Sequence, residues 1–178
     1  MSMFPIATAT VSGSSTTTVT FSSIPQTFTH LEIRAVFNNT NSVAGNSTYI
    51  RFNADGGTNY NSHYMLGTGS AVVTGNYGGS GPWGWFGNYP TNIASTRAVT
   101  IASVLDYTNT NKAKVVKVNN GYDSNTNDVQ GSWIFSTLWT STAAITSLSL
   151  NATGAGNVFT AGSRFDLYGI STSNTTGA

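Results

Sequence analysis

Short runs of alternating apolar and polar residues recur along the whole chain, and no segment places apolar residues at helical spacing. The clearest run is His30–Phe37, in which Leu31, Ile33 and Phe37 share one face. Successive side chains on a β-strand point to opposite sides of the sheet. This run therefore predicts a strand with one buried apolar face and one solvated face.

Similar runs, separated by clusters of Gly, Asn, Ser and Pro, predict about ten strands. They cover residues 6–11, 16–21, 30–37, 48–53, 60–66, 97–107, 113–118, 130–139, 145–150 and 164–170. The glycine-rich segment 67–92 is expected to be a long surface excursion with one or two irregular strands. Short strands at this spacing favour an all-β fold, an antiparallel two-sheet sandwich that is jelly-roll-like. We expect a single domain over residues 1–170 and a flexible polar tail over residues 171–178.

Asp and Gly at one connection carry a turn signal. Residues 48–53 and 60–66 are both expected to be strands, and Asp55-Gly56-Gly57 lies between them. We interpret the three elements as a β-hairpin. The residues expected to define this hairpin are Asn53, Asp55, Gly56, Gly57, Asn59 and Tyr60.

The composition of the chain argues against some classes of binding partner. Charged residues make up 7% of the chain and the net charge is +1. A nucleic-acid backbone needs a concentrated basic face, which the group Lys112, Lys114 and Lys117 does not supply. No apolar run reaches the length of a membrane span, and the amino-terminal residues show no secretion-signal pattern. We expect neither nucleic acid nor a membrane as a partner. A near-neutral surface is easier to tolerate in a protein that stays assembled.

Candidate catalytic and metal-binding residues are few. The chain has no cysteine and two histidines, His30 and His63, neither of which stands in a nucleophile motif. The run 123–128 resembles the start of a calcium loop, but Asp128 stands where the loop needs Gly and Ile134 where it needs Glu. We therefore expect no catalytic residue, no metal and no cofactor, and a protein that is not an enzyme.

An aromatic group in the glycine-rich segment is the candidate contact site. Flat aromatic rings stack on sugars and fill pockets at protein interfaces. The alternative is that these rings cap one end of the sandwich. The four residues are Trp83, Trp85, Phe86 and Tyr89.

Four segments, in this order, resemble virion structural proteins of tailed phages. Residues 24–33, IPQTFTHLEI, are similar to an "IPqtYthLqI" segment of those proteins. Residues 49–63 resemble their FNGDxGxNY-like stretch, with Ala54 in place of the usual Gly. Residues 106–112 resemble a hairpin between strands, and residues 164–170 end in the LYGI pattern of a closing strand. The resemblance implies a β-sandwich component of the particle, either of the head or of the tail.

Three hypotheses of function follow. The first is a capsid decoration (cement) protein on the virion surface, made in the host cytoplasm, forming a homotrimer and stabilising the head by binding the major capsid protein. The second is a tail or fibre component that contacts glycans of the host surface through the aromatic group. The third is a free carbohydrate-binding β-sandwich module.

Overall fold

The computed structural model describes residues 1–40, 47–90, 96–123, 131–152 and 156–172, and within them the chain forms strands without helices. Every strand pairing is antiparallel. The strands are β1 (Ser2–Thr10), β2 (Thr18–Phe21), β3 (His30–Phe37), β4 (Ser47–Phe52), β5 (Tyr60–Gly67), β6 (Val72–Gly81), β7 (Gly84–Asn88), β8 (Ala98–Leu105), β9 (Lys114–Tyr122), β10 (Gly131–Trp139), β11 (Leu148–Ala152) and β12 (Arg164–Ser171).

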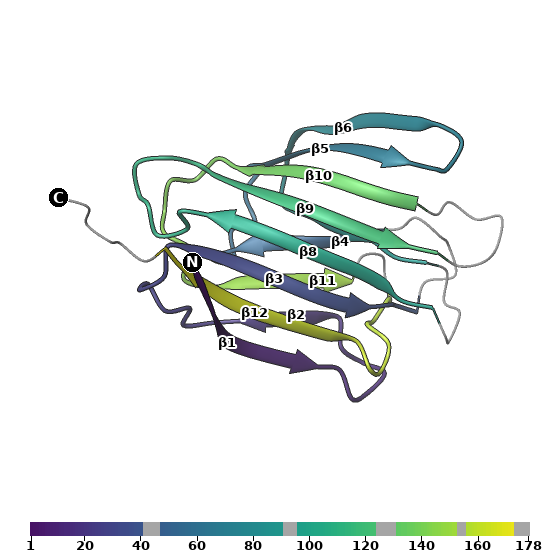
Figure 1. Cartoon of the computed structure of the whole chain (residues 1–178), viewed down its shortest axis with the longest axis horizontal. Coiled ribbons are helices and arrows are strands. Elements are labelled where there is room, and N and C mark those ends of the chain that lie inside the picture. Colours follow the sequence, from purple (N-terminus) through teal and green to yellow (C-terminus); the bar gives the residue numbers. More distant parts are fainter. Residues whose placement is uncertain (41–46, 91–95, 124–130, 153–155, 173–178) are drawn as a thin grey trace.

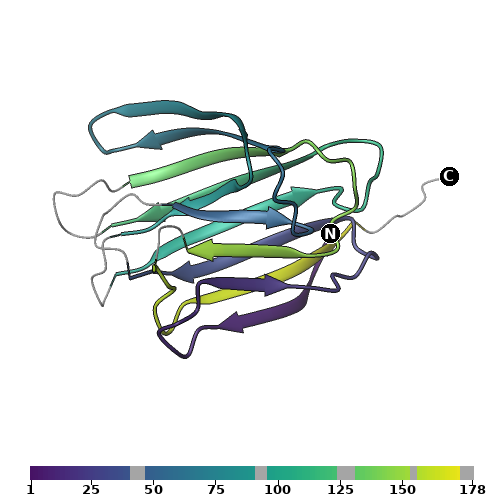
Figure 2. The same cartoon turned by 180° about the vertical axis from the view of Figure 1, so that it is seen from behind.

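The strands form two sheets that pack face to face. An eight-stranded sheet has the order β1-β12-β3-β8-β9-β10-β5-β6, and a four-stranded sheet has the order β2-β11-β4-β7. Figure 1 shows the larger sheet from β1 at the bottom to β6 at the top, and Figure 2 shows the smaller sheet in front of it. The predicted two-sheet antiparallel sandwich is confirmed.

The core lies between the sheets and follows the alternation seen in the sequence. On β3, Leu31, Ile33 and Phe37 are fully buried, as predicted. Rings of Phe37 and Phe165 stack with centroids 5.7 Å apart, and Phe159 meets Phe165 edge-on at 4.9 Å. Offset and edge-on contacts are the favoured geometries of aromatic pairs, so this cluster holds the sheets together near β3 and β12.

Several predicted boundaries change in the structure. The glycine-rich segment 67–92 contributes two strands, β6 in the large sheet and β7 in the small one. Strand β9 continues to Tyr122 because Asn120 and Tyr122 are buried, although residues 119–122 were expected in a loop. Strand β11 begins at Leu148 because the amide of Ile145 donates to the carbonyl of Tyr107 instead of joining the ladder. Residues 124–130 of the calcium-like run and residues 173–178 of the expected tail lie outside the described residues.

The predicted hairpin at residues 53–59 is wrong. Strand β4 pairs with β7 and β11, whereas β5 pairs with β10 and β6, so the segment carries the chain from one sheet to the other. The signal for a tight turn is real, because Asn53 and Ala54 have φ values of 50° and 54°. A turn signal gives the local backbone shape but not the partner of the strand that follows.

Asp55 and its neighbours instead hold a corner between the sheets. The Asp55 carboxylate accepts hydrogen bonds from the Gly57 amide at 2.9 Å, the Asn59 side chain at 2.9 Å and the Trp139 indole at 2.7 Å. These hydrogen bonds lower the pKa of Asp55, and the bond from Trp139 has the largest effect. The buried Tyr60 hydroxyl accepts from the Phe52 amide, and burial raises the pKa of Tyr60 to about 12.

The rest of the predicted group also serves this corner. Asn53 Oδ1 accepts from the Thr146 and Ser147 amides at 2.9 and 3.1 Å, while its Nδ2 donates to the Ala144 carbonyl. Gly56 lies at the exposed tip of the turn, with the Arg51 side chain as its nearest neighbour. The six residues therefore have a structural role, at a crossover rather than at a hairpin.

Candidate functional site

The outer face of the eight-stranded sheet, turned away from the core, carries side chains in regular rows. Strand register aligns Arg34, Ile101, Asn119, Ile134 and Met65 across five consecutive strands. Their immediate neighbours along each strand are buried, except Tyr64 beside Met65, which is half-buried. This row shows that large aliphatic residues sit at positions where an exposed sheet usually has polar ones.

Six outward-facing aliphatic residues of this face, among them Ile101 and Ile134 of the row, form what we call the aliphatic surface. Their side chains are 37 to 59% exposed, and they come from β3, β8, β9 and β10, at the centre of the sheet. Apolar groups gathered on one face in this way mark interaction sites more often than scattered ones do. The aliphatic surface consists of Val36, Val99, Ile101, Leu105, Val115 and Ile134.

Most charges around the aliphatic surface are neutralised within the chain. Arg34 and Glu32 form an ion pair at 2.8 Å. Arg164 and Asp166 form another at 3.0 Å. The hydrogen bond with Glu32 raises the pKa of Arg34 further above its ordinary value. The face therefore presents little net charge.

A second group of charges lies at the β8–β9 turn. Lys112 pairs with Asp106, and its hydrogen bond lowers the pKa of that carboxyl. Lys114 is 1% exposed and donates to the carbonyls of Lys112 and Thr142 at 2.9 and 3.0 Å. Lys117 is exposed and makes no ion pair with any residue that the structure describes. Lys117 thus adds one uncompensated positive charge to the described part of this face.

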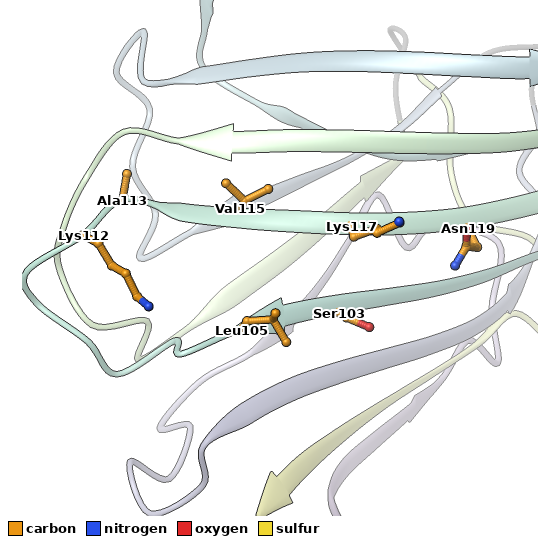
Figure 3. A pocket seen from close by; sticks show the side chains of 7 residues that line it. All are labelled: Ser103, Leu105, Lys112, Ala113, Val115, Lys117 and Asn119. Atoms are coloured by element: carbon orange, nitrogen blue, oxygen red, sulfur yellow. The ribbon is translucent and has the colours of Figure 1, made fainter. Parts of the chain in front are cut away.

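A groove crosses the aliphatic surface between β8 and β9 (Figure 3). Its volume is about 460 Å³, and Leu105 and Val115 give it apolar walls. Lys112 lies at one end and Asn119 at the other, with Lys117 between them along β9. Two shallower hollows of about 300 Å³ each adjoin Val99 and Ile101 on the same face. The surface is therefore uneven enough to receive protruding side chains.

The aromatic group predicted as a contact site lies mostly inside the protein. Phe86 and Tyr89 are 0% exposed and Trp85 is 7% exposed. Trp85 packs against Phe135 with ring centroids 5.5 Å apart. The prediction that these three rings form a contact site on the surface is therefore wrong. The alternative, that they close one end of the sandwich, describes them better.

Trp83 is the member of the group that stays partly exposed. The Arg51 guanidinium carbon lies 3.2 Å from its ring centroid, and the Tyr49 ring lies 6.4 Å away. Arg51 Nε also donates to the Pro82 carbonyl, which fixes the guanidinium in place. A cation thus covers part of the Trp83 ring that a sugar would need.

Side chains of the large sheet explain why β7 is buried. Ser62 and Thr137 hydroxyls are 2.8 Å apart; Ser62 Oγ accepts from the Trp85 amide, and Thr137 Oγ1 donates to the Trp85 carbonyl. In the same way, the Asn120 side chain accepts a hydrogen bond from the Asn88 amide and donates one to the Asn88 carbonyl, both at 3.0 Å. These polar side chains replace the ladder that β7 lacks on its second edge.

The remaining candidates for chemistry are dispersed. His30 Nδ1 accepts from the Asp106 amide at 3.0 Å, and Asp106 Oδ1 lies 3.4 Å from the same nitrogen. His63 lies on the outer face of β5, opposite Ser136. Among the described residues, no three His, Asp or Glu side chains gather as a metal site would require. In the same part of the chain, no helix is long and apolar enough to cross a membrane.

Comparison with known proteins gives no family. No protein-family model and no curated protein matches the chain. Galectin LEC-6 from Caenorhabditis elegans, a solved structure, is 12% identical over 96% of both chains, with a TM-score of 0.28. A score this low carries no argument. The class that the fold defines is an antiparallel β-sandwich. Any inference about function therefore depends on the surface described above.

Proposed function

We propose that this chain is a non-enzymatic structural subunit on the surface of a tailed-phage particle, where it binds other virion proteins through the aliphatic surface. The observation that carries the proposal is that surface itself, six exposed aliphatic residues at the centre of a sheet face. The ion pairs beside these residues, Glu32 with Arg34 and Arg164 with Asp166, leave the face with little net charge to oppose apolar contact. The resemblance of residues 24–170 to virion proteins is the reason that we propose a phage particle as the location of the chain.

A capsid decoration protein is the specific role we propose. Such a protein must lie flat on a larger assembly, and a broad sheet face with shallow hollows suits that contact. The groove between β8 and β9 would take an aliphatic side chain of the partner between Leu105 and Val115. The unpaired Lys117 would then meet an acidic group beside it. The major capsid protein is the partner that decoration requires.

Binding to particles tests this role. The purified chain is added to phage particles that lack it, and the bound copies are counted by quantitative mass spectrometry relative to the major capsid protein. Copy numbers comparable with those of the capsid protein are expected. A variant with Ile101→Ser and Val115→Ser should lose this binding, while the matched variant Met3→Ser, at the edge strand β1, should keep it.

The outcomes separate the alternatives. A few copies per particle would place the chain in a tail or fibre and overturn decoration. Absence of the chain from native particles would overturn both virion roles. Equal binding by the Ile101→Ser, Val115→Ser variant and by the unaltered chain would overturn the aliphatic surface as the docking face.

A second candidate is a glycan-binding module, which the partly exposed pair Tyr49 and Trp83 favours. Aromatic rings offer flat apolar faces for contact, and in Trp83 only the part of the ring that Arg51 leaves uncovered would be open to a sugar. Trp83→Ala should then abolish binding on a glycan array while Ile101→Ser leaves it unchanged. No glycan bound by the unaltered chain would remove this candidate.

A further inference from the structure

The four outer edges of the two sheets differ in how they are protected. Backbone groups on an open edge can pair with a strand of another chain, so proteins usually block them. The edge strands are β1 and β6 in the large sheet and β2 and β7 in the small one. Only an edge that is long, regular and uncharged invites pairing.

Three of the four edges are closed or short. Strand β1 contains Pro5, which has no amide hydrogen, and its register shifts between Pro5 and Ala7. Strand β2 has 4 residues. Strand β7 has its backbone bonded by side chains of the opposite sheet, among them Thr137 and Asn120. Proline, irregular register and bonded backbone each prevent the addition of a strand.

In the part of the chain that the structure describes, strand β6 has no proline and no side chain bonded along its edge, and its one register shift with β5 lies beyond Tyr77. It spans 10 residues, Val72–Gly81, without a proline or a charged residue. Its pairing with β5 is regular from Val72 to Tyr77. Gly75 is needed there because a Cβ would lie 2.8 Å from the Tyr64 ring, so this glycine serves packing. In Figure 1, β6 forms the uppermost border of the molecule.

Apolar side chains are exposed on both sides of this edge. Val72 is 69% and Val73 42% exposed, and on the neighbouring strand Met65 is 45% exposed. The hairpin of β5 and β6 has His63 as its one ionisable group other than tyrosine. Two identical copies can therefore approach without charge repulsion, and they would bury these side chains.

We propose that β6 pairs antiparallel with β6 of a second copy about a two-fold axis, which joins the two large sheets into one. An edge is complementary to itself only in this isologous arrangement. A head-to-tail chain of copies would need a second open edge, and β1 is closed by Pro5. The pairing uses a different part of the molecule from the aliphatic surface, so it stands or falls independently of docking through that surface. It gives a dimer, in place of the homotrimer expected from the sequence.

Analytical ultracentrifugation of the unaltered chain tests the stoichiometry. A concentration-dependent monomer–dimer equilibrium is expected, because a ladder of this length buries a modest area. Thr74→Lys should raise the dimer dissociation constant at least about tenfold, since it places a lysine of each copy on the paired edge, where like charges repel. Met3→Lys adds the same charge at the β1 edge and should leave the constant unchanged. A monomer at every concentration, or a trimer, would overturn the pairing.

Cysteine cross-linking tests the geometry, and it is unambiguous because the chain has no cysteine of its own. Val72, Thr74 and Asn76 pair with Gly67, Met65 and His63, so they share the outer side of β6. Opposed Cα atoms in an antiparallel pair are about 4.5–5.5 Å apart, within reach of a disulfide. Moving a cysteine two residues from the axis separates it from its copy by about 13 Å.

Single variants Val72→Cys, Thr74→Cys and Asn76→Cys are oxidised separately, with Met3→Cys as the control. Either one of the three is expected to cross-link with itself much faster than the others, or, if the axis passes through Val73 or Gly75, a mixture of two variants two residues apart is expected to cross-link fastest. Met3→Cys is expected to remain monomeric. If none of the three, alone or mixed in these pairs, exceeds the control, the two-fold pairing is overturned. Faster cross-linking in a mixture of Thr74→Cys with Met3→Cys than in either alone would show head-to-tail pairing instead.

Discussion

The two faces of the eight-stranded sheet carry similar side chains but have different roles. On β10, Phe135 points inward and is fully buried, whereas its neighbour Ile134 points outward and is 37% exposed. Inward residues meet the second sheet and contribute to folding. Outward residues meet solvent in the isolated chain, so their aliphatic character contributes little to its stability. The docking proposed for the aliphatic surface would account for the aliphatic character of these outward residues.

The largest expected effect is on the inner face. Phe135→Ala removes a ring that packs against Trp85 and Trp133 at centroid distances of 5.5 and 5.6 Å. The free energy of unfolding should fall by about 3–5 kcal/mol, measured by urea denaturation. Ile134→Ala, one residue away, should cost less than about 1 kcal/mol. Equal losses would show that the two faces are not distinct.

The corner that joins the sheets should respond next. Asp55→Asn weakens three hydrogen bonds to a carboxylate and should lower the free energy of unfolding by about 1–3 kcal/mol at pH 7. Asn59→Ala removes one donor and should cost less. A variant at Asp55 as stable as the unaltered chain would contradict the role of the carboxylate in the corner.

The same carboxylate predicts a pH dependence. The pKa of Asp55 is lowered in the folded state, so the unfolded state binds more protons in acid. Its contribution is present above the unfolded pKa of about 3.9 and is lost as the pH falls through the folded pKa. Stability measured from pH 7 to pH 2 should therefore decline less steeply in Asp55→Asn. Parallel curves for the two proteins would contradict this.

Polar residues of the inner face should show a smaller effect. Thr137→Val keeps the shape but removes the hydroxyl that donates to the Trp85 carbonyl at 3.1 Å. An unpaired buried carbonyl costs about 1–3 kcal/mol, and the lower part of this range is expected because Val fills the same space. Ser136→Ala, on the outer face, should change stability by less than about 0.5 kcal/mol.

The smallest effect on stability is expected on the aliphatic surface. Ile101→Ser and Val115→Ser remove side chains that are 40% and 49% exposed. Each should change the free energy of unfolding by no more than about 1 kcal/mol. The same variants should lose particle binding, so stability and docking would separate. A large loss of stability would mean that this face belongs to the folding core.

Strands with a clear local alternation of apolar and polar residues could be predicted from the sequence. The pairing of strands that lie far apart in the chain could not. Strand β3 has the predicted bounds because alternation along eight residues is enough to define it. The β8–β9 hairpin was also predicted, and the two strands pair. The Asp55 turn was recognised, but its strands belong to different sheets. The residues of the Asp55 turn set the local backbone shape, whereas pairing of β4 with β7 and β11, and of β5 with β10 and β6, depends on contacts elsewhere in the chain.

The aromatic group shows the same limit at the level of side chains. Trp85, Phe86 and Tyr89 lie in glycine-rich sequence, which suggested a surface loop. They are buried because Gly84 and Gly87 let β7 approach the large sheet: a Cβ at Gly84 would lie 2.4 Å from Thr137, and one at Gly87 2.8 Å from Thr100. The glycines were therefore a signal of close packing, which composition alone does not distinguish from a loop.

By itself, the sequence determined that the chain is an all-β sandwich with a nearly neutral surface and no cysteine chemistry, because alternation and composition are local properties. The tertiary structure decided which alternating face is buried, which edge of the sheet stays open, and where the aromatic rings lie. Those features depend on contacts between residues far apart in the chain. An exposed Ile101 and a buried Ile33 follow from the position of the second sheet, since both lie in equally regular strands.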